Sequence, residues 1–381
     1  MFSQVESDLG FKPGDSVNEW RITECLHLSR RSCVLRAVDA EGGRAVLKIL
    51  RQPTPGVQEL ARFRHEFELA RRFEHPHILR PTQMQSFAGR PYLVLPDLPA
   101  RALREHLRQG VLDSQTVLRI ALALVDALQA IHARRVVHRD ISPGNILLSG
   151  PDCEVLSLID FGLAAEISTE RPLLLRADVL EGSLATLAPE QTGRMSRDVD
   201  YRADFYSLGA TLFEALTGEP VFAFNDAAQA VHAHLAVPAP LATTRRAGIF
   251  APLAQVLRHC LHKEPEARYQ SHAAFRQDLA LCLKSLREGR ELPDFRPGQA
   301  DRLGRFQISG RLYGREAMLG QLAEAFDRAA QGDCGLVAIA GFSGIGKTAL
   351  VQAAHRSLLA QRGSFAAAKF NQFGQDRPYG A

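Results

Sequence analysis

The chain has 381 residues with a formal net charge of +4 at pH 7, and 46% of its residues are hydrophobic. This length favours two or three domains of globular composition, and the charge is too weak to indicate a nucleic-acid partner. No uninterrupted apolar run has transmembrane length, and the polar start is unlike a signal peptide, so we expect no membrane partner. The six cysteines form no C-x-x-C pair, which argues against zinc or disulfides and predicts a reducing, cytoplasmic location.

Three short segments with the pattern of strands follow a polar lead-in at residues 1–18. They comprise residues 20–26, 32–38 and 44–50. Lys48 lies inside the third strand. A lysine at such a position either extends along apolar surface to solvent or holds a phosphate group, and the strand alone leaves both readings open.

A helical pattern comes next, at residues 57–73, and it carries Glu66 nine residues before the stretch HPHIL. A later strand at residues 92–95 leads into the short stretch Pro96-Asp97-Leu98. Residues 117–131 then place apolar side chains at helical spacing, which predicts a core helix rather than a binding surface. The order of these elements predicts a mixed lobe of strands and one helix ahead of a helical region.

Two short motifs supply polar groups suited to phosphoryl transfer. The first is HRDISPGNILL at residues 138–148, and the second is LIDFGL at residues 158–163. Asp140 can accept a proton from a hydroxyl group, while Asn145 and Asp160 offer the hard oxygen ligands that Mg²⁺ prefers. A carboxylate base beside such a pair fits this chemistry, because its catalysis is mostly positioning and charge neutralisation.

These motifs resemble the protein-kinase signatures H-R-D-x-x-x-x-N and D-F-G in both spacing and order. A chance H-R-D would not also bring Asn145 and the D-F-G stretch into register. The resemblance implies an α+β bilobal kinase fold over residues 19–285 that uses ATP and Mg²⁺. It also implies that Lys48 binds phosphate and that Glu66, or its neighbour Glu68, pairs with that lysine.

The same resemblance assigns the adenine site. The stretch after the strand at residues 92–95 corresponds to the hinge between the lobes, with Leu95 as the gatekeeper. Pro96 lacks an N–H group but keeps a carbonyl that can accept from the adenine amino group, while the Leu98 N–H donates. Val34 follows the loop that covers the phosphates and belongs to the same site.

In the helical region, Asp113 or Ser114 can cap the helix at residues 117–131. The kinase resemblance further implies that Asp204 anchors the backbone of the catalytic loop. It also implies that Arg268 pairs with Glu190 of the A-P-E motif.

A second domain is predicted at residues 312–381, after a linker at residues 286–311 that is rich in Gly, Pro, Arg and Asp. An apolar strand at residues 334–340 runs into GFSGIGKT, a Walker A loop in its strand–loop–helix context. No acidic Walker B strand follows, so we expect the truncated start of an α/β P-loop NTPase domain without ATPase activity of its own. The expected nucleotide-binding residues are Gly341, Gly344, Gly346, Lys347 and Thr348.

The order of the two domains, together with HRDISPGNILL and the stretch EQTGR at residues 190–194, narrows the resemblance. The chain is similar to large bacterial signalling proteins that join a serine/threonine-kinase-like domain, a STAND-type ATPase and a GAF–histidine-kinase tail. This implies the front part of a longer protein or a truncated relative. It also implies a protein substrate bearing Ser or Thr, and downstream signalling domains or two-component partners.

Some residues depart from the kinase pattern. His27, Ser29 and Ser32 occupy positions where glycines normally let the backbone approach the phosphates. Ser142 replaces a lysine that normally contacts the γ-phosphate, and Ser183 replaces a threonine near the substrate hydroxyl. An active serine/threonine kinase is favoured because the base and metal set is present. The alternatives are a nucleotide-binding regulatory pseudokinase that controls the ATPase module and, less favoured, a scaffold for that module.

Arg139 precedes the catalytic aspartate and can pair with a phosphate on the activation segment, as in kinases that loop phosphorylation switches on. Ser168 and Thr169 are the candidate phosphorylation sites. The alternative is that Arg139 pairs with Asp178 or Glu181 without any modification.

Overall fold

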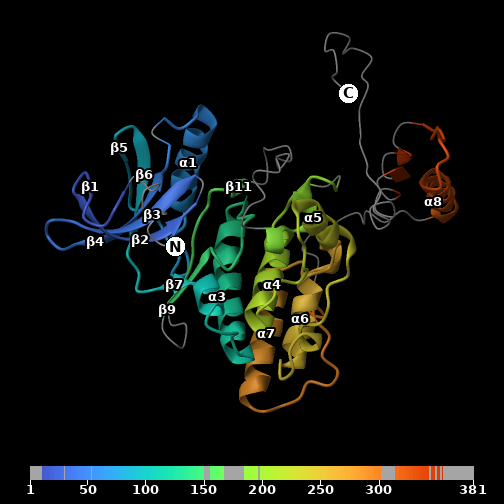
Figure 1. Cartoon of the computed structure of the whole chain (residues 1–381). Helices are drawn as coiled ribbons and strands as arrows, with labels where there is room; N and C mark the ends of the chain where they lie inside the picture. The colour runs from blue at the N-terminus through green and yellow to red at the C-terminus, as the bar shows by residue number, and fades with distance from the viewer. Residues whose placement is uncertain are drawn as a thin grey trace, which may run out of the picture.

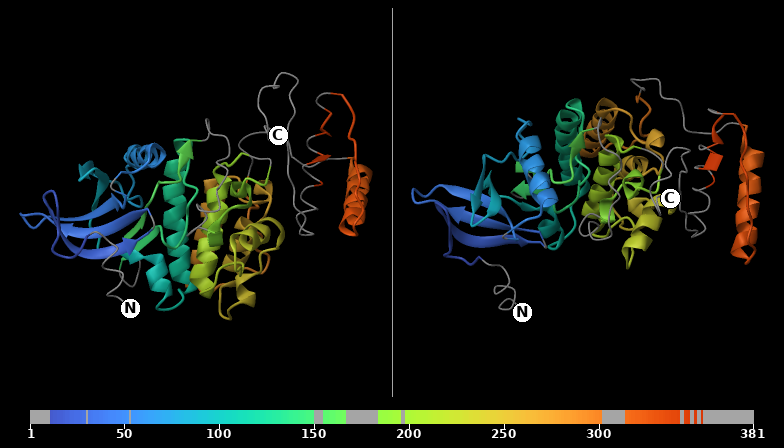
Figure 2. Two further views of the ribbon diagram at one scale, coloured as in Figure 1. Left: turned by 45° about the horizontal axis from the view of Figure 1, so that its top comes forward. Right: turned by 90° about the horizontal axis from the view of Figure 1, so that it is seen from above.

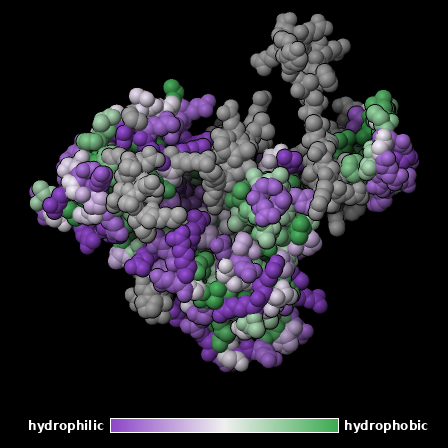
Figure 3. Space-filling view, viewed as in Figure 1, coloured by the Kyte–Doolittle hydropathy of each residue, from purple (hydrophilic) through white to green (hydrophobic). Residues whose placement is uncertain are grey.

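The computed structural model describes most of the chain. The described residues are 11–29, 31–52, 54–149, 155–166, 184–195, 198–301, 314–342, 345–347, 350, 351 and 354. Within them, a lobe built on a sheet is followed by a lobe built mainly of helices (Figure 1). Figure 2 shows the two lobes side by side from two further directions, with helix α3 at the boundary. Apolar and polar residues are intermixed on the face drawn in Figure 3.

The first lobe contains an antiparallel six-stranded sheet in the order β1-β2-β3-β4-β6-β5. Its strands are β1 (Ser16–Val17), β2 (Trp20–Leu28), β3 (Ser32–Val38), β4 (Arg44–Leu50), β5 (Gln83–Phe87) and β6 (Arg90–Pro96). Because side chains alternate between the two faces of a strand, Leu35, Leu47 and Val94 lie in one apolar cluster with Phe11. The alternate residues of β3 and β4, Lys48 among them, belong to the other face.

Helix α1 (Val57–Ala70) packs on that other face and closes a smaller apolar cluster with the sheet. Phe63 and Phe67 of the helix pack in it with Leu50 of β4 and Leu93 of β6. The helix ends three residues before the end predicted from sequence, since Arg71 already serves as its C-cap. Glu66 lies on the buried side of this helix, as the spacing of its apolar neighbours requires.

The helical lobe surrounds α3, whose side chains form the middle of a large core cluster. Its helices are α2 (Leu103–Leu107), α3 (Ser114–Ala133), α4 (Arg202–Thr217), α5 (Ala227–Ala236), α6 (Ala251–Cys260) and α7 (His272–Arg287). Asp113 rather than Ser114 caps α3, with its Oδ1 accepting from the N–H groups of Gln115 and Thr116 at 2.8 and 3.0 Å. By length and composition α3 could cross a membrane, but here ten of its residues are buried within the lobe.

Helix α4 is buried on nearly every side, which is why its apolar residues are not confined to one face. It packs against α6 at Gly209, where a Cβ atom would lie 2.7 Å from the Cβ of Cys260. Only glycine permits that approach of the two helices. The helix ends at Gly218, which adopts the left-handed conformation (φ 80°) that commonly terminates helices.

Short strands and 3₁₀ turns connect these helices and shape the region between the lobes. The strands are β7 (Arg101–Ala102), β8 (Val136–Val137), β9 (Ile146–Ser149), β10 (Val155–Leu158) and β11 (Ala165–Glu166). The 3₁₀ turns are η2 (Leu184–Thr186), η3 (Pro189–Thr192), η4 (Ala242–Thr244) and η5 (Pro265–Ala267). Strands β9 and β10 pair antiparallel, and β8 pairs with β11. The catalytic-loop motif runs from the end of β8 into β9, and the D-F-G stretch lies between β10 and β11.

The first part of the expected linker contacts the helical lobe. Helix α7 continues to Arg287, and the chain after it returns along the lobe. Asp278 of α7 accepts from the Gly298 N–H at 2.7 Å, and Asp301 accepts from the Ser271 hydroxyl at 2.8 Å. Phe295 packs against the core cluster. Residues 288–301 are therefore a docked segment, because side-chain and backbone contacts hold it although its composition has no periodicity.

The strand predicted at residues 334–340 does not form, although these residues are all described. Leu336 is 97% exposed. Helix α8 (Glu316–Ala330) precedes these residues, and none of its side chains is buried within the described part of the chain. The prediction was wrong because an apolar run becomes a buried strand only when neighbouring strands satisfy its backbone N–H and C=O groups.

Candidate active site

Asp204 of α4 anchors the backbone of the catalytic-loop motif. Its two carboxylate oxygens accept from the backbone N–H groups of His138 and Arg139, each at 2.8 Å. Burial would raise the pKa of Asp204, but His132, whose Nε2 lies 2.8 Å from Oδ2, and the His138 N–H keep it below its ordinary value. The sequence-based prediction that Asp204 anchors this loop is confirmed.

Two groups of the proposed machinery meet within the loop. Asn145 Nδ2 donates to Asp140 Oδ2 at 2.8 Å and to the Asp140 carbonyl at 2.9 Å. Since the amide nitrogen is used in this way, the amide oxygen of Asn145 is the atom left to ligate a cation. The same contact fixes the orientation of the Asp140 carboxylate, which a general base needs.

Lys48, Glu66 and Asp160 form a compact charged group between the lobes. Lys48 Nζ lies 2.6 Å from Glu66 Oε1 and 3.0 Å from Asp160 Oδ2. The expected Lys48–Glu66 pair therefore forms, and the neighbouring Glu68 is exposed. Burial, with Asp160 nearby, raises the pKa of Glu66 to about 7 despite the lysine. Burial would raise the pKa of Asp160 also, but Lys48 holds it below its ordinary value.

Left-handed backbone occurs at two residues of the site. Arg139 has φ 65° and Asp160 has φ 66°, which is unusual for residues other than glycine. Asp160 Oδ1 accepts from the Gly162 N–H at 3.0 Å and so holds its own turn. Phe161 then packs between the ring of Phe73, 5.4 Å away between centroids, and that of His138, 4.9 Å away. Both motifs are thereby fixed by packing as well as by polar contacts.

The hinge follows β6 as predicted, and Leu95 pairs with Val46 of β4 at the back of the site. Pro96 ends the strand, and the Leu98 carbonyl accepts from the Ala100 N–H at 2.8 Å. Val34 of β3 pairs with His27 and with Lys48, so it lies beside the phosphate-binding lysine. The structure thus places Val34 and Leu95, both expected at the adenine end, on the two strands that flank the strand of Lys48.

The turn between β2 and β3 lacks the glycines that kinases normally have there, and contacts between serines stabilise it instead. Ser29 Oγ lies 2.9 Å from the Ser32 carbonyl and accepts from the Ser32 N–H at 3.0 Å. Arg51 Nη1 donates to the Ser29 carbonyl at 3.1 Å, which ties the turn to the end of β4. Ser142, the other departure, is only 3% exposed and brings no charge to the loop.

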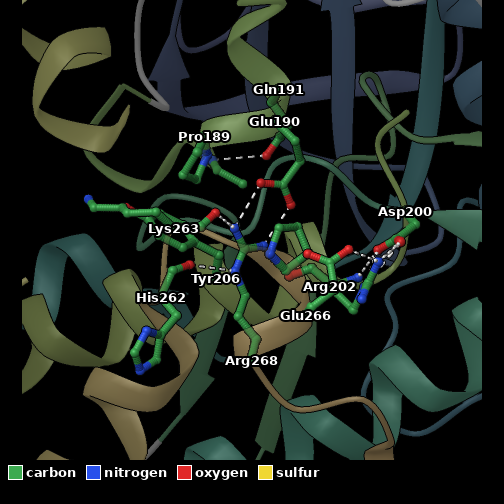
Figure 4. Close-up of polar contacts among 12 residues, drawn as sticks. Pro189, Glu190, Gln191, Asp200, Arg202, Tyr206, His262, Lys263, Glu266 and Arg268 are labelled. Carbon is green, nitrogen blue, oxygen red and sulfur yellow. Dashed lines mark hydrogen bonds and ion pairs between the residues drawn. The ribbon is translucent and has the colours of Figure 1, made fainter. Parts of the chain in front are cut away.

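The A-P-E motif is fixed to the lower part of the helical lobe by a buried ion pair (Figure 4). Arg268 donates to both carboxylate oxygens of Glu190, at 2.6 and 2.8 Å, as the sequence predicted. The same guanidinium donates to the carbonyls of His262, Arg202 and Lys263, at 2.7, 2.9 and 3.0 Å. This bidentate arrangement suits arginine in particular, because its planar guanidinium has several donors.

The Walker A residues are only partly described. Lys347 Nζ donates to the carbonyls of Gly341 and Phe342 at 2.7 and 2.8 Å, and Gly346 has φ 92°. The remaining expected residues of this loop, Gly344 and Thr348, lie outside the described residues. The activation-segment residues considered above also lie outside them, namely Ser168, Thr169, Asp178, Glu181 and Ser183.

Sequence reasoning missed two contacts near the site. His132 of α3 links Asp204 to His272 of α7, with 2.7 Å between His132 Nδ1 and His272 Nε2. Neither histidine belongs to a recognised motif. Asp97 of the hinge binds two arginines of the sheet. A buried-helix pattern that contains a histidine was the available signal for His132, whereas Asp97 gave none beyond its charge.

The groups present fit the metal that phosphoryl transfer requires. No cluster of three His, Cys, Asp or Glu residues that could hold a metal by itself occurs among the described residues. The available ligands are the Asn145 amide oxygen and the Asp160 carboxylate, which are hard oxygen donors. Mg²⁺ is commonly bound in this way, by one or two side chains together with phosphate oxygens of the substrate.

The bilobal fold, the paired lysine and the two motifs define a protein kinase, and comparison with known proteins agrees. The chain matches the protein kinase domain over residues 30–279 and the AAA ATPase domain over residues 311–381. The first match covers more than half of the chain, so the chain belongs to the protein kinase family. The kinase-then-ATPase order predicted from sequence is confirmed by the two matches.

Among curated relatives, the serine/threonine-protein kinase Pkn1 of Myxococcus xanthus is 35% identical over 248 residues, which cover 64% of this chain and 35% of Pkn1. The hybrid signal transduction histidine kinase G of Dictyostelium discoideum is 27% identical, over 71% of this chain and 10% of that protein. The chain therefore spans about a third of the first relative and a tenth of the second.

A solved kinase domain of Mycobacterium tuberculosis PknI shares the fold. It is 26% identical to this chain with a TM-score of 0.54, and the match covers 71% of this chain and 98% of that one. The predicted α+β bilobal fold is confirmed by this likeness.

Proposed function

We propose that this chain transfers the γ-phosphoryl group of ATP to a serine or threonine hydroxyl of a protein substrate. The observation that carries the proposal is the assembled Lys48–Glu66–Asp160 group at 2.6 and 3.0 Å, facing a catalytic loop in which Asn145 orients Asp140. The names of the relatives support serine and threonine as acceptors. Reduced cysteines without disulfides in the described residues accord with a cytoplasmic setting.

Each group has a role that its contacts support. Asp140, held by Asn145, accepts the proton of the attacking hydroxyl as the oxygen approaches phosphorus. Lys48, held by Glu66, presents its charge to the phosphates of the nucleotide. Mg²⁺, when bound, neutralises the phosphate charge, and the oxygens of Asn145 and Asp160 are the groups that would hold it.

The proposal is tested by the transfer of ³²P from ATP to a generic protein substrate. Asp140→Asn keeps the size of the side chain and removes the base, so we expect activity to fall by a factor on the order of 100 or more. Glu68→Gln is the matched control, because Glu68 is exposed on the same helix as Glu66. Equal activity of wild type and Asp140→Asn would contradict the proposed base.

A regulatory pseudokinase is the second candidate, and two features favour it. Ser142 is buried and uncharged at the position of the catalytic-loop lysine, and the β2–β3 turn is closed by serine contacts rather than by open glycine backbone. A wild-type protein that binds Mg²⁺–ATP but transfers no phosphate would establish this alternative. Under both candidates, Asp160→Ala should abolish the Mg²⁺ dependence of ATP binding, since it removes a metal ligand.

A further inference from the structure

The hinge carries an acidic residue whose side chain is held by two strands of the sheet. Asp97 follows Pro96, the last residue of β6. Arg36 Nε lies 3.0 Å from one carboxylate oxygen of Asp97, and Arg44 Nε lies 3.2 Å from the other. The Asp97 side chain is only 7% exposed, so the carboxylate is enclosed by these partners. Both of its oxygens are bound, which restricts rotation of the side chain.

Strand register explains why these residues meet. Arg44 precedes Ala45, and Ala45 pairs with Pro96 of the neighbouring strand. Arg36 lies on β3 opposite Val46, on the face that Val34 shares. The two arginines therefore project from adjacent strands at the hinge end of the nucleotide-binding face.

A fourth charge completes the group. Glu24 of β2 pairs with Arg36 in the sheet and also binds its guanidinium. Burial would lower the pKa of Arg36, but Asp97 and Glu24 together raise it. We call the four residues Glu24, Arg36, Arg44 and Asp97 the hinge clamp. It is neutral as a whole, two cations against two anions, and it links three strands to the hinge.

We propose that Asp97 is a positioning residue that fixes the hinge backbone and thereby sets selection of adenine over guanine nucleotides. The inference rests on the proposed function to the extent that ATP binds in this cleft. With the Asp97 side chain anchored at both oxygens, the peptide groups on either side of it are held in one orientation. Those groups end in the Pro96 carbonyl and the Leu98 N–H, which face the base in the expected binding mode.

The chemistry of Pro96 makes this orientation selective. Proline has no N–H, so at this position the hinge offers only an acceptor. Adenine presents an amino donor at C6, whereas guanine presents a carbonyl acceptor there. Guanine would thus place its C6 carbonyl against the Pro96 carbonyl. Both acceptors would then lack a donor, which is unfavourable in an enclosed site. Guanine binding would require a shift of the hinge that offers a donor, and the hinge clamp opposes that shift.

The test compares ATP and GTP in the full chain. Asp97→Asn keeps the shape of the side chain and removes the charge that binds the arginines. Calorimetric Kd values for ATP and GTP are measured for wild type and variant, with kcat and KM for each nucleotide. We expect the preference for ATP to fall by about fivefold, the factor that corresponds to the upper range for a partly exposed ion pair. We expect kcat with ATP to stay within about twofold of wild type, as removal of uniform binding predicts.

Two further variants separate positioning from folding. Arg44→Gln removes one clamp contact from a side chain that is 66% exposed, so it should fold normally and shift the preference in the same direction. Asp126→Asn is the matched control, because it breaks the surface pair with Arg276 at 2.8 Å in the other lobe. The control should leave the ATP-to-GTP ratio unchanged, since neither residue approaches the hinge.

The outcomes are distinct. An unchanged ATP-to-GTP ratio in both Asp97→Asn and Arg44→Gln overturns the inference. Equal losses for both nucleotides, together with a lower melting temperature, also overturn it, because they indicate a merely structural role. If wild type binds ATP but transfers no phosphate, the proposed function fails, while the Kd ratios still decide the role of Asp97.

Discussion

Replacing Arg268 with methionine tests the buried ion pair that fixes the A-P-E motif to the helical lobe. The Arg268 and Glu190 side chains are 0% and 1% exposed, so the change leaves a carboxylate without its cation in the interior. It also removes the donors to three backbone carbonyls. Breaking one partner of such a buried pair costs about 3–5 kcal/mol, mostly because the remaining charge is uncompensated.

The assay is thermal unfolding at pH 7, followed by circular dichroism. For a domain of this size, each kcal/mol shifts the melting temperature by about 2–4 °C, so the expected loss is about 6–20 °C. The matched control is Arg276→Met, which breaks the exposed Arg276–Asp126 pair at 2.8 Å. Exposed pairs contribute about 1 kcal/mol or less, so the control should lose at most a few degrees.

A double variant decides whether the isolated charge is the cause. Combining Glu190→Gln with Arg268→Met removes the charge that the single Arg268 change leaves behind. We therefore expect the double variant to be more stable than the sum of the two single losses predicts. A loss for Arg268→Met no larger than that of Arg276→Met, or strictly additive single losses, would refute this account.

Three further changes address other parts of the chain. Asp113→Ala removes the cap of α3 and should destabilise the protein by about 1 kcal/mol, measured by denaturant unfolding. The pKa of Glu66 is raised to about 7 by burial, so kcat/KM for ATP should fall as pH drops through 7 and the Lys48 ion pair is lost. Glu66→Gln should remove this decrease in kcat/KM below pH 7. The same decrease in the variant as in wild type would contradict the assignment to Glu66. Gly298→Ala, with φ 77° and a Cβ 2.9 Å from His259, should loosen the docked segment, detected as faster limited proteolysis at residues 288–301.

The elements of the kinase fold were predictable because their signals are local or have fixed spacing. Helical spacing puts Glu66 on the buried side of α1. Lys48 lies on the face of β4 that α1 covers, so the two side chains meet. The hinge clamp had no such signal. Arg36, Arg44 and Asp97 come together only through strand pairing, and the register of β2 against β3 shifts at two irregularities that no sequence pattern marks.

The predicted strand at residues 334–340 shows the opposite limit. Its composition is right for a buried strand, yet Leu336 is almost wholly exposed and Lys347 donates to the carbonyls of its own loop. A strand is stabilised by its neighbours, because the free energy lies in ladder hydrogen bonds and in covered faces. The docked segment is the reverse case, since single contacts such as that from Gly298 to Asp278 order it without any pattern.

The backbone of the catalytic centre could not be predicted from local preference at all. Arg139 and Asp160 adopt left-handed conformations, which are uncommon for residues other than glycine, although aspartate tolerates them better than arginine does. For Arg139, the cause is Asp204, which lies 65 positions away and binds the Arg139 N–H directly. For Asp160, it is the contact with Lys48 from the other lobe together with the Gly162 N–H. Tertiary contacts thus hold this uncommon backbone at Asp160, a proposed metal ligand, and at Arg139, next to the proposed base Asp140, which is where local rules are expected to fail.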